Sequence, residues 1–232
     1  LDLAADPNDK ETIYVGGVNI FKSTDRGKTW KINAHWVGSG GAPAIHADQH
    51  VLEYQPGTDN LYVGNDGGVY FTDNGGSKWT DISEGIGIAQ IYRLGQSATT
   101  RDLVINGFQD NGTGLYENGS WFTVLGGDGM DCVIDPKDPK YGYSDLYYGD
   151  VRRYTNGRSS GRIAANGKNG ITESGAWVTP FVLKEGTPST MFIGYKNVWR
   201  STNIQNTSSA SVTWTKISNN LGSSNTKNIV FL

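Results

Sequence analysis

One eight-residue pattern occurs twice in this chain, and it constrains the fold more than any other feature. Residues 23–30 read STDRGKTW and residues 72–79 read TDNGGSKW. In both, a hydroxyl residue is followed by Asp or Asn, then by glycine and then by tryptophan. The Asp or Asn side chain accepts hydrogen bonds from nearby backbone, glycine tolerates positive φ, and tryptophan is a large apolar anchor. A pattern that returns about every 45 residues predicts β-hairpin corners in a repeat architecture.

The segments that flank the two patterns also repeat. LAADP followed by TIYVGG is echoed by LEYQP followed by NLYVGN, and CVIDP followed by YGYS is a third copy. The pattern resembles the Asp-box, or BNR repeat, of β-propeller proteins, a superfamily that includes sialidases, some endoglucanases, sortilin-type receptors and secreted bacterial surface proteins. The resemblance implies a structural corner on the face away from the ligand site, without a catalytic role. The corner residues are Ser23, Asp25, Gly27, Trp30, Thr72, Asn74, Gly76 and Trp79.

Composition favours an all-β protein. The 232 residues include 32 Gly, 7 Trp and 12 Tyr, which fits many short strands joined by turns. This length suits a single β-propeller domain over residues 1–232. A net charge of −3 argues against nucleic acid as a partner. The sequence contains no run of 18 apolar residues, so we predict no membrane span. The one cysteine, Cys132, is expected to be a small buried side chain.

The strand runs divide the chain into about five four-stranded blades. Five blades can close a small propeller, and they can also form an arc of a larger one that a partner segment completes. Both alternatives stay open. The chain begins with Leu and ends in an apolar run, so we expect either a mature segment or a fragment of a longer chain; in the second case the remainder is a candidate partner. The blades are predicted at residues 1–36, 46–84, 86–125, 128–179 and 180–221, with a tail at 222–232 that starts or closes a blade.

The polar segments of the sequence are predicted to share one face. In a blade with strands A to D, the D–A and B–C connections open on the top face, while the corner is the C–D connection at the bottom. HADQH, NDGG, QDNGT and GGDGMD all fall in top-face connections. The ligand-binding candidates are therefore His46, Asp48, His50, Asp66, Gln109, Asp110, Asp128 and Asp131.

His46, Asp48 and His50 form an alternating set. In an extended strand alternate residues share a face about 6–7 Å apart, so all three are expected to point into the central channel. Two imidazoles and a carboxylate suit a transition metal, whereas the Asp-rich turns suit Ca²⁺. Histidines that bond to neighbouring strands, and Asp, Asn and Gly in tight turns, need no ligand. A divalent cation and a purely structural role are both left open.

The residues that could support catalysis are the carboxylates and the arginines. A glycosidase needs two carboxylates across the scissile bond, and Asp48, Asp66, Asp110 and Asp128 are the candidates, although nothing in their spacing selects a pair. A sialidase needs an arginine triad. The sialidase Arg-Ile-Pro signature is absent from the sequence, and the arginines considered are Arg93, Arg101, Arg152 and Arg153.

Several aromatic residues exceed what the corners require. Aromatic faces stack on sugar rings, and Trp and Tyr are common anchors for protein ligands. The same residues also serve to pack neighbouring blades against each other. They are Trp36, Trp121, Phe122, Tyr147, Tyr148 and Trp199.

Similarity to the secreted bacterial branch implies an extracellular or cell-surface location. The predicted function is a non-catalytic binding or scaffold propeller that recognises glycan or protein on its top face. Two alternatives remain. One is a glycoside hydrolase, sialidase-like or endoglucanase-like, that uses the top-face carboxylates. The other is a sortilin-like receptor that takes a peptide in the central channel.

Overall fold

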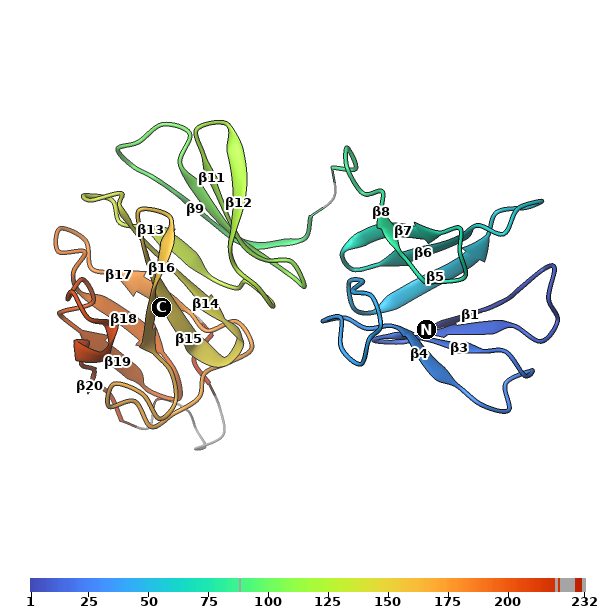
Figure 1. Cartoon of the computed structure of the whole chain (residues 1–232). Coiled ribbons are helices and arrows are strands. Elements are labelled where there is room, and N and C mark those ends of the chain that lie inside the picture. The colour runs from blue at the N-terminus through green and yellow to red at the C-terminus, as the bar shows by residue number, and fades with distance from the viewer. Residues whose placement is uncertain (88, 220, 222–227, 231–232) are drawn as a thin grey trace. The chain divides into compact units, whose positions relative to one another are not determined.

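The computed structural model describes residues 1–87, 89–219, 221 and 228–230 (Figure 1). The chain divides into two compact units, Leu1–Ile88 and Ala89–Leu232, called unit 1 and unit 2. Over the described residues it forms five four-stranded antiparallel sheets, each with its strands in chain order. This meander is the blade of a β-propeller, so the predicted fold class is confirmed. The single-domain prediction concerns how the units are arranged, and it stays a prediction.

Unit 1 contains the first two sheets. Their strands are short because turn residues interrupt each apolar run after four to six residues. Neighbouring strands pair in register, with Leu3 opposite Val15 and Val63 opposite Tyr70. The first sheet has β1 (Asp2–Ala5), β2 (Ile13–Gly16), β3 (Ile20–Ser23) and β4 (Lys31–Ala34), and the second has β5 (Gln49–Tyr54), β6 (Leu61–Asn65), β7 (Gly68–Thr72) and β8 (Thr80–Asp81).

Unit 2 contains the third, fourth and fifth sheets and two short 3₁₀ segments. The tail predicted to start or close a blade lies mostly outside the described residues; within residues 228–230, the Ile229 N–H donates to the Tyr195 carbonyl (2.7 Å). The third sheet has β9 (Ile91–Gln96), β10 (Val104–Phe108), β11 (Gly112–Glu117) and β12 (Ser120–Leu125); the fourth has β13 (Cys132–Ile134), β14 (Tyr141–Leu146), β15 (Asp150–Thr155) and β16 (Arg158–Ala164); the fifth has β17 (Phe181–Leu183), β18 (Met191–Gly194), β19 (Val198–Ser201) and β20 (Thr215–Lys216); the 3₁₀ segments are η1 (Tyr147–Gly149) and η2 (Ser209–Ser211).

The first predicted corner joins β3 to β4 through its own side chains. The Ser23 hydroxyl oxygen accepts from the Gly27 N–H (2.8 Å), and Asp25 Oδ1 accepts from the Thr29 N–H (2.8 Å). Gly27 has φ of 80°, a conformation that glycine adopts at little cost. The hydrogen bonds to the Thr29 hydroxyl and backbone lower the pKa of Asp25 to about 2. The Asp25 carboxylate thus accepts a hydrogen bond from the backbone at this turn.

The second corner repeats this geometry between β7 and β8. The Thr72 hydroxyl oxygen accepts from the Gly76 N–H (2.9 Å), and Asn74 Oδ1 accepts from the Lys78 N–H (3.0 Å). Trp79 follows and is 8% exposed, within the core of unit 1. The corner also packs on the preceding sheet, because the Asn33 amide of β4 donates to the Gly75 carbonyl (3.3 Å).

A third corner forms in the fifth sheet, although its Asn203 and Thr213 stand ten residues apart in the sequence. Asn203 Oδ1 accepts from the Ser201 hydroxyl (3.0 Å) and from the Thr213 N–H (3.0 Å). Trp214 then buries its ring, and its Nε1–H donates to the Ile163 carbonyl (2.7 Å) in β16 of the preceding sheet. Each of the second and third corners therefore contacts the sheet that precedes it.

Apolar side chains from adjacent sheets fill the cores of both units. In unit 2 one cluster includes Met191, Ile193 and Trp214, and another includes Ile105, Ile134 and Cys132. Cys132 is 4% exposed, as predicted, and burial raises the pKa of its thiol to about 12. A thiol in such surroundings is inert.

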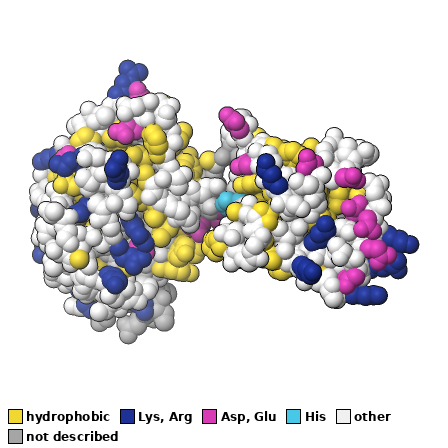
Figure 2. Space-filling model, viewed as in Figure 1, with side chains coloured by type: hydrophobic (Ala, Val, Ile, Leu, Met, Phe, Trp, Pro, Cys, Tyr) yellow, Lys and Arg dark blue, Asp and Glu magenta, His cyan; other side chains and the backbone are white. Residues whose placement is uncertain are grey.

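Charged side chains of both signs lie on the surface. On the face of unit 1 in Figure 2, Lys and Arg (dark blue) lie beside Asp and Glu (magenta). Arg26, for example, pairs with Glu11. Over the described residues, no helix has the length and apolar character needed to cross a bilayer.

The third and fourth sheets approach each other at their backbones. A Cβ on Gly107 would lie 2.0 Å from the Met130 carbonyl oxygen, and a Cβ on Gly129 would lie 2.1 Å from the Gly112 carbonyl oxygen. The Gly129 N–H donates to the Phe108 carbonyl (2.9 Å). Glycine is required at these positions because backbone, which cannot move aside cheaply, occupies the space of a side chain.

We therefore expect Gly129→Ala to destabilise unit 2 by about 3 kcal/mol, since overpacking against backbone forces the two sheets apart. Gly126→Ala is the matched control, because a Cβ at Gly126 meets nothing within 4 Å. Urea denaturation monitored by tryptophan fluorescence measures both. Equal midpoints for the two variants would contradict the close approach.

Candidate functional site

The HADQH segment of unit 1 does not form the extended strand that its alternation predicts. Strand β5 begins at Gln49, and Asp48 has φ of 62°, in the left-handed region. A left-handed residue turns the chain, so His46, Asp48 and His50 do not follow the alternation of one strand. The expectation that the three side chains share a strand face is wrong for this reason.

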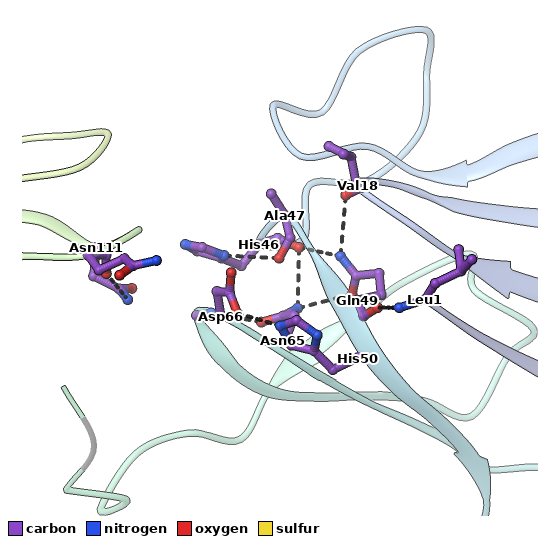
Figure 3. A network of polar contacts seen from close by, with 11 residues as sticks. Leu1, Val18, His46, Ala47, Gln49, His50, Asn65, Asp66 and Asn111 are labelled. Carbon is purple, nitrogen blue, oxygen red and sulfur yellow. Dashed lines mark hydrogen bonds and ion pairs between the residues drawn. The ribbon is translucent and has the colours of Figure 1, made fainter. Parts of the chain in front are cut away.

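Buried amides fix this segment instead (Figure 3). The Gln49 side chain is buried, and its Nε2 donates to the His46 carbonyl (2.6 Å) and the Val18 carbonyl (3.4 Å). Asn65 Nδ2 donates to the same His46 carbonyl (3.2 Å) and to Gln49 Oε1 (3.2 Å). The network joins the turn after β2 to the entrance of β5. Gln49 and Asn65 are positioning residues that the sequence reasoning missed, because an amide in a polar motif carries no signal of burial.

His50 and Asp66 are joined by a hydrogen bond at the rim of unit 1. His50 Nε2 lies 2.5 Å from Asp66 Oδ1, with the two side chains 58% and 28% exposed. A carboxylate oxygen of Asp48 lies within 4.8 Å of one of Asp66. This arrangement gathers two carboxylates and one imidazole from the D–A and B–C connections of the second sheet. The cation prediction for His46, Asp48 and His50 stays a prediction.

In unit 2 the QDNGT and GGDGMD segments meet through their backbones. Asp110 has φ of 59°, and its N–H donates to Asp128 Oδ1 (2.9 Å). Gln109 Oε1 accepts from the Tyr92 hydroxyl (2.9 Å). The Asp128 carboxylate therefore caps a tight turn, which is a structural role for one of the predicted site residues.

Asp131 and Asp145 lie together, with Asp145 fully buried and Asp131 partly exposed. Asp145 is 0% exposed, and its Oδ1 accepts from the Asp131 N–H (2.6 Å). Burial raises the pKa of Asp145 well above its ordinary value, and the nearby Asp131 charge acts in the same direction. Burial also raises the pKa of Asp131, although the Cys132 N–H and Arg93 oppose this effect.

A cavity of about 340 Å³ opens beside Asp131. Arg93 of β9 lines it on one side, and the connection from β16 to β17 lines it on another. The cavity thus combines a guanidinium, a carboxyl group with a raised pKa and an indole within one concave surface. Its lining is Arg93, Asp131, Ala176, Trp177, Val178, Pro180 and Val230.

Three exposed aromatic rings adjoin this cavity, and we call Tyr147, Tyr148 and Trp177 the aromatic platform. The Tyr147 and Trp177 rings stack with centroids 5.1 Å apart and planes 9° apart, and Tyr148 meets Trp177 edge-on at 5.5 Å. The three residues are 40%, 51% and 43% exposed. They form a rigid apolar surface whose outer faces remain in contact with solvent.

The platform is held by a strained backbone. Tyr148 has φ of 63° and ψ of 18°, which costs a residue with a Cβ about 1–2 kcal/mol. Its N–H reaches the carbonyls of Ala176 (3.2 Å) and Trp177 (3.3 Å), and its carbonyl accepts from the Gly175 N–H (3.1 Å). The Trp177 Nε1–H donates to the Tyr92 hydroxyl (3.3 Å). Strain that surrounding contacts maintain is typical of functional sites.

The structure separates the predicted aromatic candidates. Trp199 is 5% exposed and donates its Nε1–H to Glu173 Oε2 (3.1 Å), so of the two roles that the sequence left open it has the packing role, in the core of unit 2. Trp177 was missed, because it lies in the connection from β16 to β17, where no repeat marks it. The remaining candidates, Trp36, Trp121, Phe122, Tyr147 and Tyr148, are all exposed.

The arginines considered for a sialidase triad have other partners. Arg153 is 2% exposed and donates to the carbonyls of Ile204 (2.8 Å) and Thr207 (3.3 Å). Arg101 lies beside Asp102 on the surface (3.6 Å). Arg153 thus anchors the loop after β19.

The eight predicted ligand-binding residues divide between the two units. His46, Asp48, His50 and Asp66 belong to unit 1, and Gln109, Asp110, Asp128 and Asp131 belong to unit 2. That all eight share one rim stays a prediction.

No known family model matches the sequence, and no curated protein matches it. Among solved structures, the chain is similar to the GH74 xyloglucanase from Xanthomonas campestris (14% identity, TM-score 0.41) and to the GH74 enzyme of Niastella koreensis (16%, 0.42). Each match covers 91% of this chain, which spans 38% and 37% of those two chains.

A third similar structure is YCF48 from Cyanidioschyzon merolae (13% identity, TM-score 0.35), with 84% of this chain and 67% of that chain covered. With TM-scores below 0.5, these similarities carry no argument about activity or ligand. The assignment of fold rests on the sheets of the chain itself.

The buried carboxyl of Asp145 predicts a pH dependence of stability. Because its pKa is raised in the folded state, folding loses stability as pH rises from the unfolded value of about 3.9 towards the folded value. We expect Asp145→Asn to remove this loss, so that its Tm relative to the parent protein increases between pH 4 and pH 7. Asp102→Asn, at an exposed turn, is the control. A constant Tm difference over this range would contradict the raised pKa.

Proposed function

We propose that the chain is a non-catalytic binding module and that unit 2 recognises carbohydrate on the aromatic platform. The observation that carries the proposal is three exposed, mutually packed rings, fixed by a strained backbone beside a concave polar surface. Exposed aromatic rings cost free energy in water unless a ligand covers them. The repeated corners, which resemble Asp-boxes, lie in C–D connections and serve the scaffold.

Carbohydrate fits the platform because sugar rings present an apolar face and a rim of hydroxyl groups. The stacked Tyr147 and Trp177 rings offer a flat apolar surface, and aromatic contacts of this kind gain beyond their buried area. Donors and acceptors surround it. The Tyr92 hydroxyl and the Gln109 amide already form one hydrogen-bonded row with the Trp177 indole.

The cavity beside the platform favours a neutral ligand. Arg93 and Asp131 line the same space; burial raises the pKa of Asp131, and the Arg93 charge opposes this effect, so the two groups interact. A strongly charged ligand of either sign would meet a group of its own sign: Arg93 would repel a cation, and the Asp131 carboxylate would repel an anion. A volume of about 340 Å³ falls within the range of small-ligand sites, roughly 300–1,000 Å³.

Binding is tested with a panel of neutral hexasaccharides, namely cellohexaose, xylohexaose and mannohexaose, with chondroitin hexasaccharide as the acidic comparison. We expect a neutral member to bind and Trp177→Ala to weaken it at least tenfold, since a central aromatic anchor typically carries more than 1.4 kcal/mol. Isothermal titration calorimetry measures the affinity. Trp36→Ala removes an exposed indole from unit 1 and serves as the control.

Two outcomes count against the proposal. Either no member of the panel binds, or Trp177→Ala and Trp36→Ala have equal effects. If instead a protein binds to unit 2 and Trp177→Ala abolishes that binding, the same surface is assigned to protein recognition.

A glycoside hydrolase is the second candidate, and one observation favours it. Asp131 has a raised pKa and lines the cavity, as a general acid does. Asp145, which contacts it, is fully buried and offers no second carboxylate to a substrate. Release of reducing sugar that Asp131→Asn abolishes, without loss of binding, would select this function. The extracellular location, the cation in unit 1 and a sortilin-like peptide site remain proposals from the sequence.

A further inference from the structure

A second cavity in unit 2 lies between the third and fourth sheets, at the end where the C–D connections are found. It has a volume of about 410 Å³. Its walls are apolar side chains of both sheets, including Leu103, Ile105, Leu115 and Ile134, and the Tyr154 ring is 3% exposed there. These residues belong neither to the aromatic platform nor to the cavity beside Asp131.

The cavity exists because the fourth sheet lacks a complete corner. In the fifth sheet, the corner tryptophan Trp214 bonds to β16 of the preceding sheet, and in the second sheet Trp79 is buried in the core. Between β15 and β16 the connection is only Asn156 and Gly157. Both residues line the cavity, opposite Leu115 of the preceding sheet. The space that a corner indole fills elsewhere is therefore left open here.

The cavity has room for a two-ring aromatic group. A cavity of about 150 Å³ accepts a benzene ring, so 410 Å³ accommodates an indole with a short side chain. The Tyr154 ring offers an aromatic partner, for which edge-on or offset contact is favourable. The cavity is open to solvent on one side, and polar side chains (Thr100, Glu117, Asp138, Lys140 and Asn156) line it together with the apolar wall. A concave site that combines apolar walls with polar groups is typical of small-molecule binding.

The rim of the cavity favours a cation. Glu117, Asp138 and Lys140 line it, giving two carboxylates and one ammonium group. Lys140 Nζ is bound to Asp138 Oδ2 at 2.6 Å, so these two charges offset each other. Within the part of the chain that the structure describes, no ion pair involves Glu117. A positively charged group at the mouth would meet the Glu117 carboxylate.

We propose that this cavity binds a small aromatic amine, with its ring between the third and fourth sheets and its ammonium group at Glu117. The geometry of both ends supports the assignment: an apolar space of indole size inside, and an unbalanced carboxylate at the mouth. This site is independent of carbohydrate binding by the aromatic platform.

Tryptamine is the probe, with indole and indole-3-acetate as uncharged and anionic comparisons. We expect tryptamine to bind at least threefold more tightly than indole, and indole-3-acetate to bind more weakly than indole. Glu117→Gln should bring tryptamine to the affinity of indole. Ligand-observed NMR titration measures the three dissociation constants.

A blocking variant locates the site. A Cβ on Gly142 lies 3.8 Å from Ile105 Cδ1 and 3.9 Å from Tyr154 Cδ2, both in ordinary contact. Gly142→Leu therefore extends a side chain into the cavity and should abolish tryptamine binding, while Gly142→Ala should retain it within threefold. Thermal unfolding of both variants checks that unit 2 is folded. If Gly142→Leu unfolds, Leu115→Trp, which fills the cavity from the other wall, replaces it.

The results separate support from refutation. No binding of tryptamine at millimolar concentration, or binding that the blocking variant leaves unchanged, overturns the proposal. Equal affinities of the three probes overturn the role of Glu117. N-acetyl-tryptophanamide provides the last comparison: binding tighter than tryptamine would assign the cavity to a peptide side chain and overturn the free amine as its ligand.

Discussion

In the second and fifth sheets, the contact between the corner and the sheet before it organises the structure. In these corners a hydroxyl residue and an Asn close the turn, and a tryptophan follows that is buried in the core; the Trp214 indole bonds to Ile163 of the preceding sheet. The fourth sheet departs from this pattern twice. Its corner is reduced to Asn156 and Gly157, and the connection from β16 to β17 carries Trp177. Both candidate binding sites of unit 2 arise from these departures, as expected where a repeat gives up local regularity for function.

The sequence was informative wherever a local rule determines the backbone. The corner spacing predicted hairpin turns at residues 23–30 and 72–79, and the alternation of apolar runs with turn residues predicted five four-stranded sheets. It failed at HADQH, because Asp48 enters the left-handed region that a strand pattern excludes. It also missed Trp177, whose importance depends on Tyr147, thirty residues away in the chain. Such tertiary pairing carries no local signal.

The carboxylates show why residue type alone is a weak guide to function. Asp128 and Asp131 stand three residues apart in one motif, yet Asp128 caps the Asp110 N–H while Asp131 borders a cavity beside the buried Asp145. Burial and hydrogen bonding separate their chemistry, and neither is visible in the spacing. The same reasoning applies to Trp199, whose side chain is 5% exposed and therefore belongs to the core and not to the surface.

The central claim is that ligand binding occurs at the aromatic platform, and ¹⁵N-edited NMR of the tryptophan indoles tests it most directly. The Trp177 Nε1–H bonds to the Tyr92 hydroxyl, so a ligand on the platform must alter its signal. During titration with the hexasaccharide that binds, we predict a shift of the Trp177 resonance, assigned with Trp177→Phe, and no shift of Trp36. A shift confined to other indoles, with Trp177 unchanged, would contradict the account.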